Sequence, residues 1–373
     1  MKIGIDARCL EWERGGVMRI FSNLLRIWPT ITDRHTFQFY FENAVPETDY
    51  LHCPLYRHRI ISGPQFLKKR RMLCEQLLLP FEIRRDKLDL FFAPYYTAPL
   101  YCPARKMVVA AWDISYTTHA SHFHWRHGLE MSVLSRLACR RAAGVITGSM
   151  FDARQIEKHY GVHRDKIFVL PLVADEKFKP TRDLSRIESL RRKYHLPKKY
   201  ILSLGVIYQR RNIDVIIKAF RDVYQEDADA GLMVVGCNST RPRIDIEGLM
   251  KPLIQEGRGW YLPRADEDEL VDLYSGAWYY ICTSTADGDT ITLKEAMQCG
   301  APVITSPLFK ESIYSNALMV NDPASINEMA EVFRYAFKSP ELRNDYSNKA
   351  LKWVEALSWP KTSGKVLHFL ENL

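Results

Sequence analysis

The segment Thr285-Ala-Asp-Gly-Asp-Thr-Ile-Thr-Leu-Lys-Glu-Ala-Met-Gln-Cys-Gly-Ala-Pro-Val-Ile304 runs from a glycine turn through a hydroxyl-rich helix start to a second turn and an apolar strand. Two of its carboxylates, Asp287 and Glu295, lie eight residues apart, one before the expected helix and one inside it. Carboxylates in these places can bind two separate sets of hydroxyl groups, while the free N–H groups of the first helical turn face an anion. A nucleotide sugar carries a ribose, a diphosphate and a hexose, so it suits this pattern. Plain structural roles also remain open, with Thr292 and Glu295 as a capping box and Asp287 as a turn residue.

Apolar strand-like runs alternate with helical patterns along the whole chain, which predicts parallel sheets built from βαβ units. We expect two doubly wound α/β domains, residues 1–177 and 178–358, connected through the polar stretch 175–199. The last helix, residues 359–373, is expected to pack back on the first domain. Ligands of such folds bind at the carboxyl ends of the strands, here in a cleft between the domains. The expected strands are 2–6, 36–41, 88–92, 106–112, 144–148 and 167–170, followed by 200–205, 231–236, 259–262, 278–282, 302–305 and 317–320.

The net charge of +8 is placed unevenly along the 373 residues. Residues 1–175 hold 25 Lys and Arg against 17 Asp and Glu, whereas residues 176–373 hold 27 of each kind. An anionic partner is therefore expected for the first half. A phospholipid surface or a lipid-diphosphate acceptor fits, and nucleic acid is not expected because no RNA-binding or recognition-helix motif is found. The pattern of residues 66–80 predicts a basic amphipathic helix with its cations at 68–71. Through residues 66–71 it can contact such a membrane peripherally, although core packing explains its apolar side equally well.

Other global features favour a reduced, cytoplasmic protein. Residues 1–6 predict a buried strand rather than a signal peptide, and no apolar run approaches the ~18 residues of a membrane-spanning helix. The eight cysteines are scattered, the closest pair being Cys282 and Cys299, so neither a zinc site nor a Cys-x-x-Cys pair is predicted.

A basic pair follows the expected strand 200–205. Gly205 lets the backbone turn sharply, which places Arg210 and Arg211 at the top of the sheet. Two guanidiniums there can bind a diphosphate in bidentate fashion and stabilise the charge that builds on it as it leaves. The alternative is an exposed basic helix start, which the helix dipole disfavours.

Three features of the first half are weaker candidates. Gly15 and Gly16 precede a helix, where they either admit a ligand close to the backbone or form a plain turn. Asp113 ends a strand, so it can face a ligand or cap the following turn. The histidines at 119, 122, 124 and 127 have ligand-like spacing, but no cysteine is near them. For His119 and His122 we therefore expect an acceptor-facing surface and no metal.

These motifs resemble those of the retaining family-4 glycosyltransferases, in order and across nearly the whole chain. The 287–295 segment resembles the Glu-x7-Glu motif with Asp287 in place of the first glutamate. Residues 205–212 resemble Gly-x5-Lys-Asn with Arg211 in place of lysine. Trp112-Asp113 resembles a His-Asp pair facing the transferred sugar, and Asp6-Ala-Arg8 with Gly15-Gly16 resembles the glycine loop near the donor phosphates.

The resemblance implies a GT-B fold, with two Rossmann-like domains facing each other across a cleft, and transfer of a hexose with retention and without a metal or other cofactor. The donor would be a GDP-mannose-like or UDP-sugar and the acceptor a hydroxyl, such as a lipid-linked saccharide of a bacterial surface polysaccharide. The first domain would bind the acceptor and the second the donor. Asp113, Arg210, Arg211 and Asp287 would be catalytic. The donor-binding positions would be Gly15, Gly16, Gly205, Arg210, Arg211, Leu262, Asp287, Thr290, Ile291 and Glu295.

Two other functions remain open at this point. The departures at Trp112, Arg211 and Asp287 are compatible with a non-catalytic or regulatory protein of the same fold. The charge alone is compatible with a protein that binds an anionic surface or nucleic acid. The sequence does not identify the base, the sugar, the acceptor or the linkage.

Overall fold

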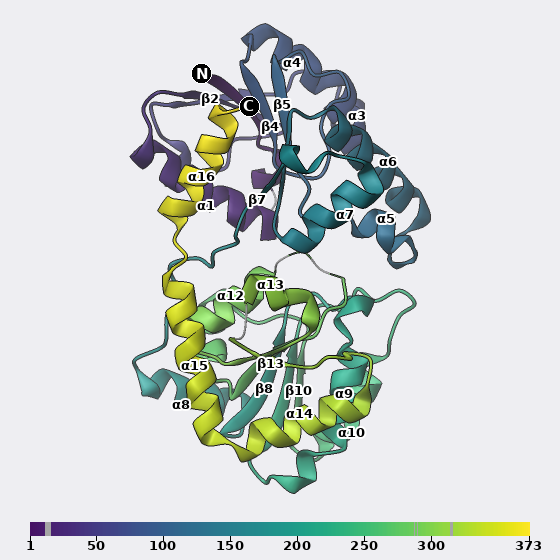
Figure 1. Cartoon of the computed structure of the whole chain (residues 1–373), viewed down its shortest axis with the longest axis vertical. Helices are drawn as coiled ribbons and strands as arrows, with labels where there is room; N and C mark the ends of the chain where they lie inside the picture. Colours follow the sequence, from purple (N-terminus) through teal and green to yellow (C-terminus); the bar gives the residue numbers. More distant parts are fainter. Residues whose placement is uncertain (12–15, 287, 289, 314–315) are drawn as a thin grey trace. The chain divides into compact units, whose positions relative to one another are not determined.

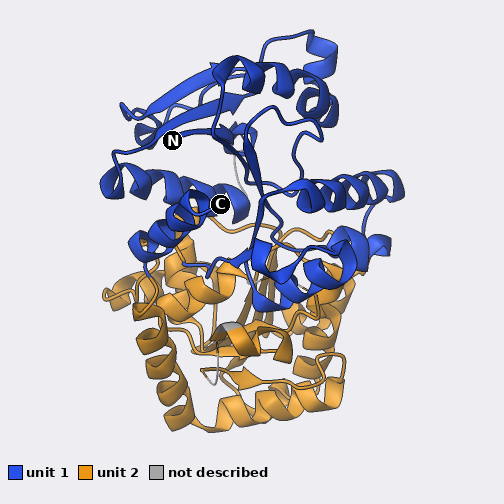
Figure 2. Ribbon diagram, turned by 45° about the horizontal axis from the view of Figure 1, so that its top comes forward, with its two compact units in different colours: residues 1–173, 358–373 blue, residues 174–357 orange. Residues whose placement is uncertain are grey.

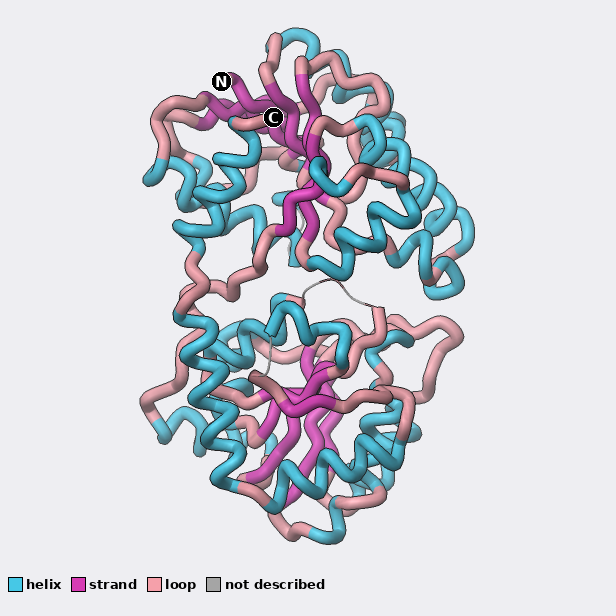
Figure 3. The backbone as a smooth tube through the Cα atoms, in the orientation of Figure 1, coloured by secondary structure: helices cyan, strands magenta, loops and turns pink. Residues whose placement is uncertain are grey.

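The computed structural model consists of two compact units, which are coloured separately in Figure 2. Unit 1 contains residues 1–173 and 358–373, and unit 2 contains residues 174–357. Each unit has its own parallel sheet, drawn in magenta in Figure 3. The residues described are 1–11, 16–286, 288, 290–313 and 316–373.

Unit 1 is built, over the described residues, on a parallel sheet of order β3-β2-β1-β4-β5-β6-β7. Most strand residues are buried, because helices cover such a sheet on both faces. The strands are β1 (Lys2–Asp6), β2 (Thr36–Phe41), β3 (Tyr56–Ile60), β4 (Leu90–Ala93), β5 (Lys106–Ala110), β6 (Gly144–Thr147) and β7 (Ile167–Val169). The helices are α1 (Gly16–Ile31), α2 (Gln65–Lys68), α3 (Arg71–Leu73), α4 (Leu79–Asp86), α5 (Ser115–Thr118), α6 (Trp125–Arg141), α7 (Met150–Tyr160) and α16 (Trp359–Glu371).

The edge strand β3 is not predicted by the sequence pattern. Its residues Tyr56-Arg-His-Arg-Ile60 carry charge where a buried strand would be apolar. Basic side chains are common on edge strands because they discourage pairing with another chain. The basic residues of β3 explain why the apolar pattern did not predict this strand, and they suit its position at the edge of the sheet.

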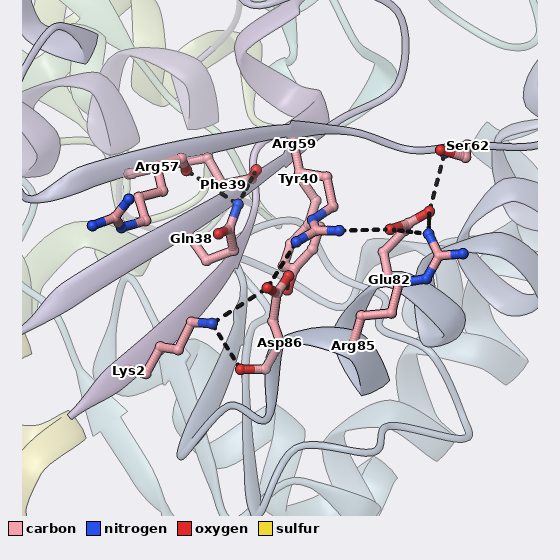
Figure 4. A network of polar contacts seen from close by, with 10 residues as sticks. All are labelled: Lys2, Gln38, Phe39, Tyr40, Arg57, Arg59, Ser62, Glu82, Arg85 and Asp86. Carbon is pink, nitrogen blue, oxygen red and sulfur yellow. Dashed lines mark hydrogen bonds and ion pairs between the residues drawn. The ribbon is translucent and has the colours of Figure 1, made fainter.

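An ion-pair network fixes α4 across three neighbouring strands (Figure 4). Asp86, buried at the end of α4, accepts hydrogen bonds from Tyr40 Oη at 2.8 Å and Arg59 Nη2 at 2.9 Å. Lys2 Nζ lies 3.3 Å from the same carboxylate, and Arg59 Nη1 lies 3.4 Å from Glu82. Burial, reinforced by Asp86, raises the pKa of Tyr40 well above its usual value, so its hydroxyl stays protonated and donates. Because β1, β2 and β3 each supply one partner, the network fixes the helix over all of them.

The basic segment 66–80 does not form the single helix that its pattern predicts. It is divided into α2, α3 and a π-helical turn, η3 (Cys74–Leu78), which leads into α4. The turn directs Glu75 into the core, where its Oε2 accepts hydrogen bonds from Arg8 Nη2 at 2.7 Å and from Thr97 Oγ1 at 2.9 Å. The buried ion pair thus explains the interruption of the expected helix.

The C-terminal helix α16, yellow in Figure 1, lies in unit 1 beside α1. Glu371 Oε1 lies 2.7 Å from His35 Nε2, and the ring of Phe369 stacks on Phe168 with 4.9 Å between centroids. These contacts attach the end of the chain to the residue before β2 and to β7 of the first sheet.

Unit 2 has, in its described part, a parallel sheet of order β10-β9-β8-β11-β12-β13. Tyr200 and Leu202 of β8 pack with α8, α11, α12 and α15, whereas Ile201 faces α9, α10 and α14, so the sheet is doubly wound. The strands are β8 (Lys199–Leu204), β9 (Ala230–Val235), β10 (Gly259–Leu262), β11 (Tyr279–Cys282), β12 (Val303–Thr305) and β13 (Leu318–Met319). The helices are α8 (Leu184–Tyr194), α9 (Ile213–Arg221), α10 (Ile246–Gln255), α11 (Leu270–Gly276), α12 (Ile291–Gln298), α13 (Lys310–Ile313), α14 (Ile326–Lys338) and α15 (Pro340–Glu355).

The strand order of unit 2 reverses between β8 and β11. The chain moves from β8 outward to β9 and β10, then returns to the other side of β8 for β11. In such sheets the loops diverge at this point and leave room for a ligand at the carboxyl ends of the strands. The loops after β8 and β11 are therefore the first place to look for a site. Among the helices of the described ranges, none is long and apolar enough to cross a membrane.

Candidate functional site

The turn after β8 places Arg211 directly over Gly205. Gly205 has φ +122°, and a Cβ atom at this position would overlap the Arg211 guanidinium. Arg211 Nη1 also donates a hydrogen bond to the carbonyl of Leu204 at 3.3 Å. On the other side, a Cβ on Gly236 would collide with the carbonyl of Gly205. Glycine is therefore required at both positions for the backbones and the arginine to approach one another.

The same turn is tied to the loop that follows β11. The Arg210 carbonyl accepts a hydrogen bond from the backbone N–H of Thr285 at 3.0 Å. Asn212, left-handed at φ 55°, donates from Nδ2 to the carbonyl of Thr283 at 2.9 Å. The Arg210 guanidinium lies over the ring of Tyr208, 4.2 Å from its centroid. Both arginines are half-buried and are held at the switch point of the sheet.

A chain of hydroxyl groups joins this turn to the start of α12. Tyr280 Oη donates to the Leu204 carbonyl at 3.2 Å and lies 2.7 Å from Thr292 Oγ1, which lies 3.1 Å from Thr290 Oγ1. Burial, aided by Cys282 and Glu295, raises the pKa of Tyr280 well above its usual value, while Arg211 opposes the shift. The hydroxyl therefore remains a donor, and both charged groups lie close enough to affect it. Tyr280 was not predicted as a site residue, because a tyrosine in a strand has the pattern of ordinary core.

Helix α12 begins at Ile291, so Thr290 is its N-cap residue. The Thr290 side chain makes no capping hydrogen bond, and Thr292 is bonded to Tyr280. The capping-box alternative for Thr292 and Glu295 is therefore wrong, because Thr292 lies inside the helix. The first N–H groups of α12 follow the hydroxyl chain at the carboxyl end of β11, where an anion would be stabilised by the helix dipole.

Glu295 is fully buried at the second position of the carboxylate motif. Its Oε2 accepts a hydrogen bond from Tyr274 Oη of α11 at 3.0 Å. The carboxylate is thus oriented by Tyr274, which was not predicted as a site residue. Contact between Glu295 and a ribose stays a prediction, and Asp287, its expected companion, lies outside the described residues.

The remaining donor-side candidates differ in position. Leu262 ends β10, two strands from β8, and its carbonyl accepts a hydrogen bond from Gly236 N at 2.8 Å. Gly16 is the first residue of α1 in unit 1, and among the described residues no atom lies within 4 Å of where its Cβ would be. Gly15 falls in the part of the chain that is not described. A role for these residues at the donor remains a prediction.

In unit 1, Asp113 stabilises the turn between β5 and α5. Its Oδ1 accepts a hydrogen bond from Ser115 N at 2.7 Å, and its Oδ2 accepts one from Tyr96 Oη at 2.9 Å. Burial, together with Asp113, raises the pKa of Tyr96 well above its usual value, so the phenol donates. The neighbouring Trp112 is buried and donates from Nε1 to the Pro94 carbonyl at 2.9 Å. The structural role proposed as an alternative for Asp113 is therefore present, and its catalytic role stays a prediction.

Of the four histidines between residues 119 and 127, the structure brings His119 and His122 together. The rings of His119 and His122 lie 5.3 Å apart, and Thr118 Oγ1 lies 2.8 Å from His119 Nδ1. His124 and His127 are exposed. Outside the gaps at 12–15, 287, 289 and 314–315, no group of three His, Cys, Asp or Glu side chains could hold a metal ion.

A buried charge cluster at the end of β1 was not assigned from the sequence. Arg8 Nη2 lies 2.6 Å from Asp6 Oδ2 and 2.7 Å from Glu75 Oε2, and Arg8 Nη1 donates to the Arg71 carbonyl at 3.1 Å. Burial alone would raise the pKa of Asp6, but the charge and hydrogen bonds of Arg8 outweigh it and hold the pKa below its usual value. The Arg71 guanidinium lies over Tyr95, 4.2 Å from the ring centroid. This cluster joins the ends of β1 and β4 to the 66–80 segment.

Two family models match consecutive parts of the chain. The model described as Glycosyltransferase Family 4 matches residues 19–178, and the model described as Glycosyl transferases group 1 matches residues 186–353. This chain belongs to the family-4 glycosyltransferases, with the GT-B fold. The residues that each family model matches correspond closely to one of the two units of the structure. The predicted family and fold class are therefore confirmed.

Curated relatives of this glycosyltransferase are distant. It is 25% identical over 235 residues to the serotype-specific mannosyltransferase WbdA of Escherichia coli, an alignment that covers 60% of this chain and 28% of WbdA. It is 22% identical over 317 residues to O-antigen chain mannosyltransferase B of Escherichia coli, covering 81% of each protein. The aligned part thus spans well under a third of the length of WbdA.

Solved structures show the same fold. Sucrose-phosphate synthase from Thermosynechococcus elongatus matches with a TM-score of 0.76 and 15% identity, covering 100% of this chain and 98% of that one. HepE from Anabaena, in complex with UDP-glucose, matches with a TM-score of 0.71 and 18% identity over 100% of both chains. At these identities the likeness establishes architecture, and the chemistry must be argued from the residues.

Proposed function

We propose that this glycosyltransferase moves a hexose from a nucleoside diphosphate sugar to a hydroxyl acceptor, with retention of the anomeric configuration. The observation that carries the proposal is the placement of Arg210 and Arg211 at the switch point of unit 2. There the turn that bears them is hydrogen-bonded to the loop before α12 and, through Tyr280, to α12 itself. Two guanidiniums and a helix N-terminus at one edge of a sheet form a positive site of the kind that binds a diphosphate.

In the proposed reaction, the bond between the sugar C1 and the diphosphate oxygen breaks and a bond between C1 and the acceptor oxygen forms. The acceptor proton passes to the leaving phosphate, so no side-chain base is required. Arg210, Arg211 and the N–H groups near Thr290 and Ile291 would stabilise the charge on the diphosphate. Glu295 would hold the ribose and Asp287 the transferred sugar, and Asp113 of unit 1 is a further candidate catalytic residue.

For the acceptor, we propose a lipid-linked saccharide of a bacterial surface polysaccharide, bound by unit 1 near His119 and His122. Two relatives are named as O-antigen or serotype-specific mannosyltransferases, which favours a mannose donor. The bound UDP-glucose of HepE makes a UDP-sugar the alternative. The excess positive charge of residues 1–175 supports an anionic acceptor and work at the cytoplasmic face of a membrane.

Part of the basic block 68–71 is available for that membrane contact. Lys69 and Arg70 are exposed, and Phe66 beside them is 67% exposed. Arg71, however, is stacked on Tyr95 and its carbonyl is bonded to Arg8. We therefore propose that Lys68, Lys69 and Arg70 contribute to binding, whereas Arg71 belongs to the fold.

A thermal-shift screen with GDP, UDP, ADP and TDP tests the donor site, because a ligand bound only by the native state raises the melting temperature. We expect at least one of the four to stabilise the protein and Arg211→Ala to abolish that shift. Arg221→Ala, on the exposed end of α9, is the matched control and should retain it. If none of the four raises the melting temperature at the highest soluble concentration, the proposed donor class is wrong.

A further inference from the structure

Helix α6 of unit 1 carries an exposed apolar stripe along its length. Trp125 is 66% exposed, Leu129 60%, Val133 46% and Leu137 37%. Residues four apart in a helix lie about 40° from each other around its axis, so these four side chains cover an arc of about 120° on one side. Scattered exposed apolar residues are ordinary on a protein surface, whereas a continuous stripe of this kind marks an interaction surface.

This stripe is not required to attach the helix to its own unit. The opposite side of α6 is buried through Gly128, Met131, Ser135, Ala138 and Cys139. Ala138 and Cys139 belong to the hydrophobic core that also contains β5 and β6 residues. Because the helix already has a complete buried face, its second apolar face is left for another partner.

Arginines lie within the apolar arc and not opposite to it. With the same helical geometry, Arg126, Arg136 and Arg140 fall between the four apolar side chains, all three in the exposed class. The Arg126 guanidinium lies over the Trp125 ring at 5.0 Å from its centroid, which leaves both groups on the exposed face. Glu130 is the single acid of the helix. A face that is both apolar and cationic is complementary to a surface that is both apolar and anionic.

The charge around α6 favours the same type of partner. Residues 90–150 contain six Lys and Arg but only two acids, Asp113 and Glu130. The Asp113 carboxylate is engaged by Tyr96 and Ser115. This stretch of sequence therefore carries a net charge of +4, six cations less two acids, which would attract it to anionic lipid headgroups.

We propose that the exposed face of α6 is an interfacial membrane-binding surface that lies in the headgroup region of an anionic bilayer. Trp125, Leu129, Val133 and Leu137 enter the boundary between headgroups and acyl chains, and Arg126 and Arg136 pair with lipid phosphates. This surface is carried by α6 alone, which is labelled in Figure 1, and includes no residue of the 66–71 segment. It does not depend on which nucleotide sugar is used.

Binding of the full chain to vesicles tests the surface. Cosedimentation with vesicles of phosphatidylglycerol and phosphatidylcholine should be strong, and with phosphatidylcholine alone it should be weak. Leu129→Gln with Val133→Gln should reduce the partition coefficient for the anionic vesicles at least fivefold, and so should Arg126→Gln with Arg136→Gln. Arg140 is left unchanged, because its Nε donates to the Tyr160 carbonyl at the end of α7.

Matched controls come from α8 and the segment before it in unit 2. Leu184→Gln replaces an apolar side chain that is 70% exposed, and Arg182→Gln with Arg192→Gln removes two exposed cations. Both controls should bind the anionic vesicles as the unaltered chain does. The melting temperatures of all variants should match, which separates loss of binding from loss of fold.

Two results would overturn the proposal. Unchanged binding to anionic vesicles after both α6 double substitutions would show that α6 does not contact the bilayer. A concentration-dependent dimer that the same substitutions abolish, in a chain that does not bind vesicles, would identify a second copy as the partner. Lys68→Gln, Lys69→Gln and Arg70→Gln together should lower vesicle binding independently of α6. If this triple variant binds vesicles normally, only the proposed role of the 66–71 segment is wrong, and the α6 variants still test the α6 surface.

Discussion

Arg211 is positioned by its own backbone turn, because its guanidinium covers Gly205 and donates to the Leu204 carbonyl. We predict that Arg211→Ala lowers kcat/KM for sugar transfer by the equivalent of ~3–4 kcal/mol, the typical loss for one preorganised donor that faces developing charge. The side chain is half-buried at the end of a sheet, so the fold should persist, as judged by an unchanged circular dichroism spectrum. Arg221→Ala should have normal kinetics. Transfer rates within about threefold of the unaltered enzyme would remove Arg211 from the reaction.

Tyr280 is predicted to be a positioning residue. Its hydroxyl is the link between the Leu204 carbonyl and Thr292 at the start of α12. Tyr280→Phe should therefore lower the free energy of unfolding by about 1 kcal/mol and leave Thr292 and the Leu204 carbonyl less well satisfied. It should also raise KM for the donor, because α12 is then held less firmly against the arginine turn.

The adjacent Tyr279 provides the matched control for this substitution. Its hydroxyl is buried on the other face of the sheet and has no hydrogen-bond partner among the residues described. Tyr279→Phe should leave stability unchanged or increase it, since it removes an unsatisfied polar group. Equal effects of the two substitutions on KM would argue against the positioning role of Tyr280.

At the scale of single residues, motif spacing selects the groups that are proposed to touch ligand and misses the groups that orient them. Arg210, Arg211 and Glu295 follow from motif spacing, whereas Tyr274 and Tyr280 have the pattern of buried core. The orienting role of a hydroxyl on a core side chain can be recognised only when its hydrogen-bond partner is known. The partners are Glu295 for Tyr274 and Thr292 for Tyr280, and neither is adjacent in sequence. Asp113 shows the converse, since the sequence left its two roles open and the structure supplies the hydrogen bonds of the structural one.

At the scale of elements, the buried cluster of Asp6, Arg8 and Glu75 links the loop after β1 to the π-helical turn η3. We predict that Arg8→Met lowers the free energy of unfolding at neutral pH by about 3–5 kcal/mol, because it leaves two buried carboxylates without their partner. Urea unfolding would measure the difference. Arg19→Met, outside the cluster on α1, serves as a comparison that should cost far less.

The pH dependence of that difference follows from the lowered pKa of Asp6. A carboxyl whose pKa is lower in the folded state stabilises the fold above its unfolded pKa, and this contribution is lost as pH falls through the folded value. The unaltered protein thus keeps this contribution at neutral pH and loses it as the pH falls below about 4, the ordinary pKa of an aspartate. The difference in stability between the two proteins should therefore be full at pH 7 and should narrow below about pH 4. A difference that is independent of pH would contradict the charged state assigned to the cluster.

Local pattern predicted most elements, and it failed where tertiary contacts decide. The alternation of apolar runs located the central strands of both sheets, because strands buried on two faces must be apolar throughout. It missed β3, whose Arg57 and Arg59 suit an edge. It also predicted one helix over residues 66–80, where the need to bring Glu75 to Arg8 introduces a π-helical turn. Neither requirement is visible within a short window of sequence.

At the scale of the whole molecule, two doubly wound units were predictable because each repeats the strand–helix alternation that builds a parallel sheet. The order of the strands was not predictable, since β8 is flanked by β9 and by β11. Tyr279 of β11 pairs with Ile201 of β8, which lies 78 residues earlier in the chain. That order places the turn after β8 beside the loop after β11. The position of the candidate diphosphate site therefore depends on topology as well as on motif.

The final prediction concerns metal dependence of the whole enzyme. Many sugar transferases neutralise the leaving diphosphate with Mg²⁺ or Mn²⁺ held by clustered carboxylates. In this chain Arg210, Arg211 and the N-terminus of α12 are positioned to supply that positive potential. Activity should therefore survive EDTA, and the histidine segment at 119–127 should bind no stoichiometric metal in a titration with Zn²⁺ or Mn²⁺. The nearest pair of acids in the motif, Asp287 and Asp289, lies outside the described residues, so the test must be made on the reaction itself. If EDTA abolishes transfer and Mn²⁺ restores it, a metal ion, and not the two arginines, neutralises the leaving diphosphate.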